Sequence, residues 1–323
     1  MLERLGLMPA QASTIASTTD ALYWFLIGLS FVFSMGIAGA LVYFSVRYRR
    51  RSDADQATQI HGSLALELVW TIIPFGLTMI VFVWSANLFV TIKRPPDDAL
   101  EVLVIGKQWM WKLQHLEGRR EINELHVPIG QAVKLTLTSE DVIHSFFVPA
   151  FRIKQDAVPG RYTTAWFEAT KTGTYHLFCA EYCGTEHARM IGRVVVMEPA
   201  DFQAWLAGEE TPVQAMAVGG DGDTVVEAGA ELFARLGCGT CHRDVRGALG
   251  PTLAGVFGSD VRLQDGGTVV ADEAYLRESI LDPRARIVQG YQAVMPTFQG
   301  LVSEEGMLQL VTYIKSLSEG RGS

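Results

Sequence analysis

Two long stretches near the N-terminus are apolar throughout. Residues 21–46 and 68–92 carry no charged side chain over 26 and 25 residues, respectively. A helix of this length reaches about 37 Å, which exceeds the hydrocarbon core of a bilayer, about 30 Å thick. The pattern therefore predicts two membrane-spanning helices. The alternative, two buried core helices of a soluble protein, is disfavoured because charge-free stretches of this length are typical of membrane spans.

Charge flanking the two stretches predicts their orientation. Residues 47–66 of the connection hold four arginines and two acids (Arg47, Arg49, Arg50, Arg51, Asp53 and Asp55). An excess of basic residues in a short loop is typical of the cytoplasmic side. We therefore expect both termini, and all of the chain after about residue 94, on the outer side. Residues 1–20 lack the apolar core of a signal peptide.

The next part of the chain changes to an alternating pattern. Within residues 99–199, Val133, Leu135 and Leu137 alternate with polar residues, and short runs of valine recur near 102–104 and 194–196. Proline and glycine separate these runs. About 100 residues of short strands with such turns predict an all-β sandwich or Greek-key barrel.

A second change of pattern follows the predicted strands. Residues 200–222 begin as a short helix and continue as a Gly-rich linker over 211–222. In residues 223–323, apolar residues recur at spacings of three and four, which predicts a small all-α domain. The chain is therefore divided into residues 1–98 with the two spans, 99–199, 200–222 and 223–323.

Composition narrows the possible functions. Hydrophobic residues make up 49% of the 323 residues and charged residues 19%, which excludes a disordered or coiled-coil chain. The net charge of −8 argues against a nucleic-acid partner, which needs a basic face. Four cysteines are too few for a disulfide scaffold, so each must be explained by its neighbours.

Two of the cysteines belong to a metal-binding pattern. Cys179, Cys183, His187 and Met190 fall within twelve residues after a predicted strand. One thiolate, one imidazole and one thioether would indicate a mononuclear copper site. The second thiolate, four residues from the first, can bridge a pair of copper ions if another imidazole is available, and His144 in DVIHSF is the natural supplier.

Other interpretations of this pattern remain open. Two cysteines and two histidines can form a structural zinc site, although Met190 then has no role. A disulfide between Cys179 and Cys183 would leave the histidines and the methionine unexplained. The other histidines lack ligand-like neighbours, and we expect surface or hydrogen-bonded residues at His61, His115, His126 and His176.

The remaining cysteines form a haem-attachment pattern. Cys238, Cys241 and His242 have the C-x-x-C-H spacing in which two thiols are linked to haem c and the imidazole binds its iron. Met295, in a loop before a proline, is the candidate second axial ligand; Met307 fits the apolar stripe of the last helix better. Pro251 can offer its carbonyl to the ring N–H of His242.

These motifs together resemble the cytochrome c oxidase subunit II family, in the branch with a fused cytochrome c. The sequence CAEYCGTEHARM fills every position of the family's C-x-E-x-C-x-x-x-H-x-x-M pattern. The resemblance implies a two-helix transmembrane hairpin, a cupredoxin-like sandwich and a class I cytochrome c domain. It implies two copper ions bridged by Cys179 and Cys183, with His144, His187, Met190 and the carbonyl of Glu181 as further ligands. In the family this glutamate side chain also contacts a magnesium ion at a subunit interface.

Two further segments resemble the family. GKQWMW places Trp109 where electrons enter from cytochrome c, although aromatic packing at the membrane surface is the simpler interpretation. ELVWTIIP places Glu67 at the entrance of a proton path in the partner subunit; without the resemblance it would be an interfacial acid.

The resemblance implies an electron-input subunit in a bacterial inner membrane. A donor such as a cytochrome c or an iron–sulfur protein would reduce the haem. Electrons would then pass to the copper pair and to subunit I, which reduces oxygen with proton pumping alongside other oxidase subunits. A nitrous-oxide-reducing enzyme would need a large catalytic domain, and a quinol oxidase subunit would lack the copper cysteines. A metal-delivery protein would have an open ligand set.

Overall fold

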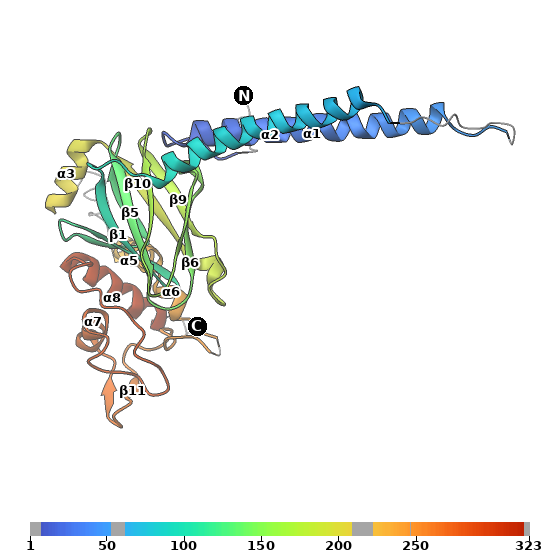
Figure 1. The fold of residues 1–323 in the computed structure, drawn as a ribbon. Coiled ribbons are helices and arrows are strands. Elements are labelled where there is room, and N and C mark those ends of the chain that lie inside the picture. The colour runs from blue at the N-terminus through green and yellow to red at the C-terminus, as the bar shows by residue number, and fades with distance from the viewer. Residues whose placement is uncertain (1–7, 53–61, 209–221, 246, 320–323) are drawn as a thin grey trace.

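The computed structural model describes residues 8–52, 62–208, 222–245 and 247–319. In chain order, these form a helical hairpin, a β sandwich and a C-terminal domain (Figure 1). His61 and nearly all of the predicted linker lie outside the described residues.

Two long apolar helices form the hairpin. α1 spans Ala16–Arg47 and α2 spans Leu64–Lys93, and both are long and apolar enough to cross a membrane. The most apolar stretch of each helix has no residue buried within the protein. These side chains are therefore available for contact with lipid or with another subunit. The ring centroids of Phe25 and Trp84 lie 5.6 Å apart between the helices. Both helices extend beyond the charge-free stretches, α1 beginning at Ala16 rather than Ala21.

The residues around the start of α1 fix the hairpin to the sandwich. Ala12 and Ile15 are buried, and the backbone N–H of Ala12 donates to the carbonyl of Ala150 at 3.0 Å. Arg152 donates from Nε and Nη2 to the two carboxylate oxygens of Asp20, at 2.7 and 2.8 Å. Both side chains are only 9% exposed, so this two-pronged ion pair is a buried contact between α1 and the sandwich.

We expect Arg152→Ala to destabilise the full chain by about 3–5 kcal/mol, because the Asp20 carboxylate stays buried without its partner. Unfolding of the purified protein in detergent measures this loss. Lys154→Ala is the matched control, since Lys154 and its partner Asp156 are 48% and 45% exposed. The control should cost at most about 1 kcal/mol. Equal losses in the two variants would contradict the anchoring role of Arg152.

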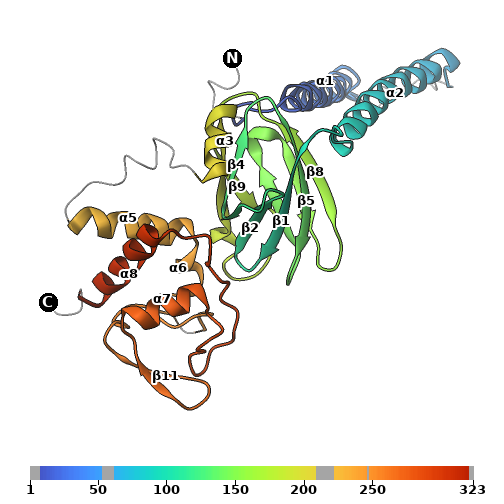
Figure 2. The same ribbon diagram turned by 90° about the vertical axis from the view of Figure 1, so that its left-hand side faces the viewer.

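Two five-stranded sheets form the sandwich (Figure 2). The first has the order β3-β2-β1-β5-β8, with bounds Arg120–Ile122, Met110–His115, Leu100–Lys107, Ala132–Ser139 and Thr163–Glu168. The second has the order β4-β10-β9-β6-β7, with bounds Glu124–Pro128, Ile191–Met197, Gly173–Cys179, His144–Val148 and Ile153–Ala157. β1 pairs with β5, and β4 with β10, in parallel. Every second residue of β5 is buried, as its alternating sequence predicts.

The C-terminal domain is helical, as predicted. Helix α3 (Pro199–Ala207) still belongs to the sandwich, and the domain itself contains α5 (Gly222–Arg235), α6 (Cys238–Cys241), α7 (Glu273–Leu281) and α8 (Glu304–Glu319). α5 packs on α8, with the ring centroids of Phe233 and Tyr313 5.2 Å apart. A short hairpin of β11 (Asp260–Arg262) and β12 (Thr268–Val270) is an addition to the all-α prediction. Strands of three residues are too short for the alternation to be recognised.

The C-terminal domain packs against the sandwich (Figure 2). Met110 and Ile122 of the sandwich belong to the same buried apolar cluster as Leu232, Leu236 and Phe298 of the domain. The predicted haem-attachment residues on α6 therefore lie beside the sandwich and not on a separate body.

Candidate metal centres

Strand pairing brings the predicted copper ligands to one end of the second sheet. His144 opens β6 and Cys179 closes β9, and these two strands are antiparallel neighbours. Residues 179–190, here called the sulfur loop, then lead into β10, which pairs with β9. The backbone N–H of Cys179 donates to the carbonyl of Met190 at 3.1 Å and closes the loop. Ligands that are distant in sequence thus meet at adjacent strand ends.

Cys183 lies at the centre of this group. Its Sγ is 3.7 Å from Cys179 Sγ, 3.5 Å from His187 Nδ1 and 3.8 Å from Met190 Sδ. On the other side, Cys179 Sγ is 4.0 Å from His144 Nδ1. The structure thus brings together the side chains that the sequence predicted as copper ligands.

The donor set fits copper. Ligand atoms of His144, Cys179 and Cys183 all lie within 4.8 Å of one another, and the three residues are buried. Cys179 Sγ also lies 3.3 Å from the carbonyl oxygen of Glu181, whose side chain is exposed. Thiolates, imidazoles and a thioether are ligands that copper prefers. Two cysteines and two histidines would also suit zinc, and the thioether of Met190 is the donor that favours copper.

The two thiols differ in how readily they ionise. A hydrogen bond with Cys183, reinforced by one with His144, outweighs burial and lowers the pKa of Cys179 to about 3. The pKa of Cys183 is raised, because its proton is shared with the Cys179 sulfur and because the thiol is buried. One thiolate forms easily, and the second requires the positive charge of a bound metal.

Asp141 orients His144. Burial alone would raise the pKa of Asp141, but bonds with His144 Nε2 at 2.8 Å and the backbone N–H of Gln108 at 2.7 Å outweigh it and lower the pKa to about 2. Burial alone would lower the pKa of His144, but bonds with Asp141 and Cys179 outweigh it and raise the pKa to about 8. With Nε2 held by the carboxylate, Nδ1 faces the sulfurs. Sequence reasoning missed Asp141, although the D-x-x-H spacing in DVIHSF was a usable signal.

The aromatic segment before β2 contacts the sulfur loop. Trp109 Nε1 donates to the carbonyl of Cys183 at 3.1 Å, and Gln108 Nε2 donates to the same oxygen at 2.7 Å. Trp109 is only 6% exposed. It therefore lies against the candidate metal centre, while its role in accepting electrons stays a prediction.

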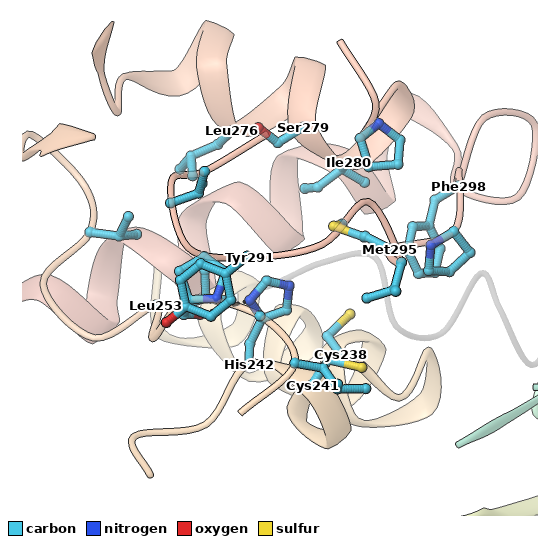
Figure 3. A pocket seen from close by; sticks show the side chains of 18 of the residues that line it. Cys238, Cys241, His242, Leu253, Leu276, Ser279, Ile280, Tyr291, Met295 and Phe298 are labelled. Carbon is cyan, nitrogen blue, oxygen red and sulfur yellow. Dashed lines mark hydrogen bonds between the residues drawn. The ribbon is translucent and has the colours of Figure 1, made fainter. Parts of the chain in front are cut away.

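The predicted haem-attachment residues line an apolar pocket in the C-terminal domain. Figure 3 shows Cys238, Cys241, His242 and Met295 pointing into it. Other lining side chains are mostly apolar, among them Leu253, Leu276, Ile280 and Phe298. Met307 is buried in the helical core at 2% exposure and does not line the pocket. The geometry supports Met295, not Met307, as the candidate axial ligand.

His242 is held in the form that binds iron. Its Nδ1 lies 2.8 Å from the carbonyl oxygen of Pro251, the contact predicted from the sequence, so Nδ1–H donates and Nε2 is free as a ligand. Burial lowers the pKa of His242 and favours the neutral imidazole. Burial raises the pKa of Cys238 to about 12 and also raises that of Cys241, so both thiols stay protonated.

The other singled-out residues lie outside both centres. Glu67 is in the first turn of α2, at the end of the hairpin far from the sandwich (Figure 1). His115 and His126 both contact the buried carboxylate of Glu121, at 3.0 and 2.5 Å, as expected of hydrogen-bonded histidines. His176 is exposed.

Two glycines give the candidate ligand histidines their space. A Cβ atom at Gly106 would lie 2.8 Å from the ring of His144, and one at Gly250 would lie 2.8 Å from the ring of His242.

We expect Gly106→Ala to displace only His144, lowering copper affinity about 10- to 100-fold with the haem spectrum unchanged. Gly250→Ala should alter only the haem spectrum. Each variant is the control for the other, and copper titration with absorption spectroscopy measures both. Identical effects of the two variants would contradict these separate contacts.

Comparison with known proteins matches three parts of the chain to family models. The family models "Cytochrome C oxidase subunit II, transmembrane domain", "Cytochrome C oxidase subunit II, periplasmic domain" and "Cytochrome c" match residues 3–88, 115–198 and 226–318. The cytochrome c oxidase subunit 2 of Alkalihalophilus pseudofirmus is 33% identical over 282 residues, covering 84% of this chain and 79% of that protein. That of Thermostichus vulcanus is 32% identical over 254 residues, covering 62% and 77%. The periplasmic domain of subunit II of the Bradyrhizobium japonicum cytochrome oxidase is 32% identical over 36% of this chain and 96% of that one, with a TM-score of 0.35.

Proposed function

The chain belongs to the cytochrome c oxidase subunit II family and carries a C-terminal cytochrome c domain, and from this premise we propose that it is the electron-input subunit of its oxidase. As such a subunit it is a membrane protein of a haem–copper oxidase, and it associates with subunit I and other oxidase subunits. Its β sandwich takes copper and its C-terminal domain takes haem c. We further propose that these domains and both termini face the periplasm of a bacterial inner membrane.

The convergence of donor atoms around Cys183 carries the proposal. Cys179 and Cys183 would bridge two copper ions, and His144 and His187 would bind one ion each. Met190 and the carbonyl of Glu181 complete the set. The sulfurs are 3.7 Å apart in a buried, preformed group, which supports a shared pair of ions over a single one.

The second centre would be held by the C-terminal domain. Cys238 and Cys241 would carry haem c through thioether bonds, with His242 and Met295 as the axial ligands. The Pro251 carbonyl holds the His242 ring 2.8 Å away in the orientation that ligation needs. The mostly apolar lining of the pocket would limit the access of water to the bound haem, which favours electron transfer over ligand exchange at the iron.

When bound, haem c and the copper pair supply one-electron redox chemistry, and we propose the order external donor, haem c, copper pair, catalytic subunit. The donor would be a cytochrome c or an iron–sulfur protein. Trp109, hydrogen-bonded to the sulfur loop, would mark the side from which electrons arrive. We assign Glu67 to the proton path and the Glu181 carboxylate to a magnesium ion at the interface with subunit I, following the family pattern.

Metal analysis of the purified full chain tests the proposal. We expect two copper atoms per covalently bound haem and a low-spin c-type spectrum. One zinc per chain and no copper would overturn it in favour of a structural Cys2His2 site.

A further inference from the structure

The segment that carries the haem-attachment residues contacts the sandwich at both ends. We call residues 235–243 the haem-attachment segment; it contains α6 and His242. Figure 2 shows α6 on the side of the C-terminal domain that faces the sandwich. The contacts at the two ends differ in kind, and together they fix both the position and the rotation of the segment.

The contact at the C-terminal end is an ion pair with the sulfur loop. Arg243 Nη2 lies 2.7 Å from Glu186 Oε1, and the two side chains are 26% and 7% exposed. Arg243 directly follows the candidate haem ligand His242, and Glu186 directly precedes the candidate copper ligand His187. The pair therefore joins the two candidate centres through residues next to a ligand of each. A carboxylate as buried as Glu186 requires a cationic partner.

The contact at the N-terminal end is a close backbone approach. Gly237 has φ of 73°, and a Cβ atom there would lie 2.8 Å from Nδ2 of Asn123. Asn123 is itself fixed in the sandwich, because its Oδ1 accepts from the backbone N–H of Trp111 at 2.8 Å. Arg235 adds a longer ion pair with Glu124, at 3.8 Å. Only glycine allows the segment to approach this closely.

An apolar contact lies between the two ends. Met110 of β2 is 3% exposed, and it lines the haem pocket together with Cys238 and Cys241. An apolar centre flanked by polar contacts is the usual arrangement of a specific interface. The polar pairs in such an interface set orientation more than they set affinity.

We propose that the Glu186–Arg243 pair is a docking clamp, which means an ion pair that holds the haem-attachment segment in position against the sulfur loop. Its effect on electron transfer rests on the proposed function; the docking itself does not. The two domains are covalently joined, so loss of the clamp does not separate them but lowers the docked fraction. Glu186→Gln removes the carboxylate from the 26% exposed Arg243, and Arg243→Gln leaves the buried Glu186 carboxylate only its longer contact with Arg189, at 3.3 Å. Either single variant therefore weakens the contact between the domains.

The test uses the full chain with copper and haem bound. It compares the wild type with Glu186→Gln, Arg243→Gln and the charge-swapped double variant Glu186→Arg/Arg243→Glu. Arg189→Gln is the matched control. Arg189 also pairs with Glu186, at 3.3 Å, but it belongs to the sulfur loop itself and is 61% exposed. The copper and haem absorption bands of each variant show whether both centres, whose candidate ligands adjoin the substituted residues, still hold copper and haem.

Two readouts separate docking from redox function. Backbone hydrogen exchange at residues 119–124 and 235–243 should be about tenfold faster than in the wild type in both single variants. It should be close to the wild-type rate in the charge-swapped double variant and unchanged in Arg189→Gln. Electron transfer between haem and copper after flash reduction should slow about tenfold in the same two variants. Wild-type exchange in both single variants would overturn the clamp. An unchanged transfer rate despite faster exchange would overturn its effect on electron transfer. A wild-type chain that shows no transfer between its centres would instead contradict the proposed function, with the exchange pattern still deciding the docking.

Discussion

Replacing Cys183 by serine should remove both copper ions from the full chain and leave the haem in place. Cys183 Sγ lies within 3.5 to 3.8 Å of three other candidate donors, those of His187, Cys179 and Met190. A serine hydroxyl is a poor ligand for copper, and no second bridging thiolate remains. The fold should survive, because the substitution changes one atom in a side chain of similar size.

Copper content and the copper absorption of the purified variant measure this effect. The reciprocal control is the double variant Cys238→Ser/Cys241→Ser, which should lose the covalent haem and keep its copper. The two centres share no ligand, so each variant should spare the other centre. Retention of two copper atoms by Cys183→Ser would show that the bridge is not made by this sulfur.

Met295→Leu should remove the second axial ligand of the haem and lower its reduction potential by about 100 mV or more, a modest part of the roughly 0.8 V that axial ligands control. Leucine fills nearly the same volume as methionine, so the pocket should stay packed. Met295 lines the pocket that holds His242, and the other lining methionine, Met110, belongs to strand β2 of the sandwich.

Met307→Leu is the matched control for this substitution. Met307 is 2% exposed in the core around α8, so its replacement should cost less than about 1.5 kcal/mol of stability and leave the haem spectrum unchanged. Absorption spectra and a redox titration of both variants distinguish the two methionines. A low-spin spectrum and unchanged potential in Met295→Leu, with changes in Met307→Leu, would reverse the assignment.

The sequence predicted most of the architecture because its patterns are long. A charge-free run of 25 residues and the alternation around Val133 to Leu137 each repeat often enough to identify a helix or a strand. Boundaries were less predictable: α1 begins at Ala16 because the residues before and around Asp20 are held by the sandwich, a contact that no local pattern encodes.

The candidate ligands could be proposed from the sequence because copper and haem require particular residue types at fixed spacings. The residues that support them were not. Gly106 lies 38 positions before His144, and Glu186 lies 57 positions before its partner Arg243. Only the folded chain shows that one glycine makes room for a ligand ring and that one acid joins the two domains. The positions of supporting residues depend on tertiary contacts, whereas candidate ligands can be partly recognised from local sequence motifs.

Stopped-flow reduction of the anaerobic full chain, monitored at the haem and copper absorption bands, tests the proposed order of electron input most directly. With less than one electron equivalent of donor, we expect the haem band to be reduced first and the copper band to follow as the haem is reoxidised. The Cys238→Ser/Cys241→Ser variant, with its copper intact, should accept electrons from the same donor far more slowly. Copper reduction at the wild-type rate in that haem-free variant would contradict the C-terminal domain as the point where electrons enter.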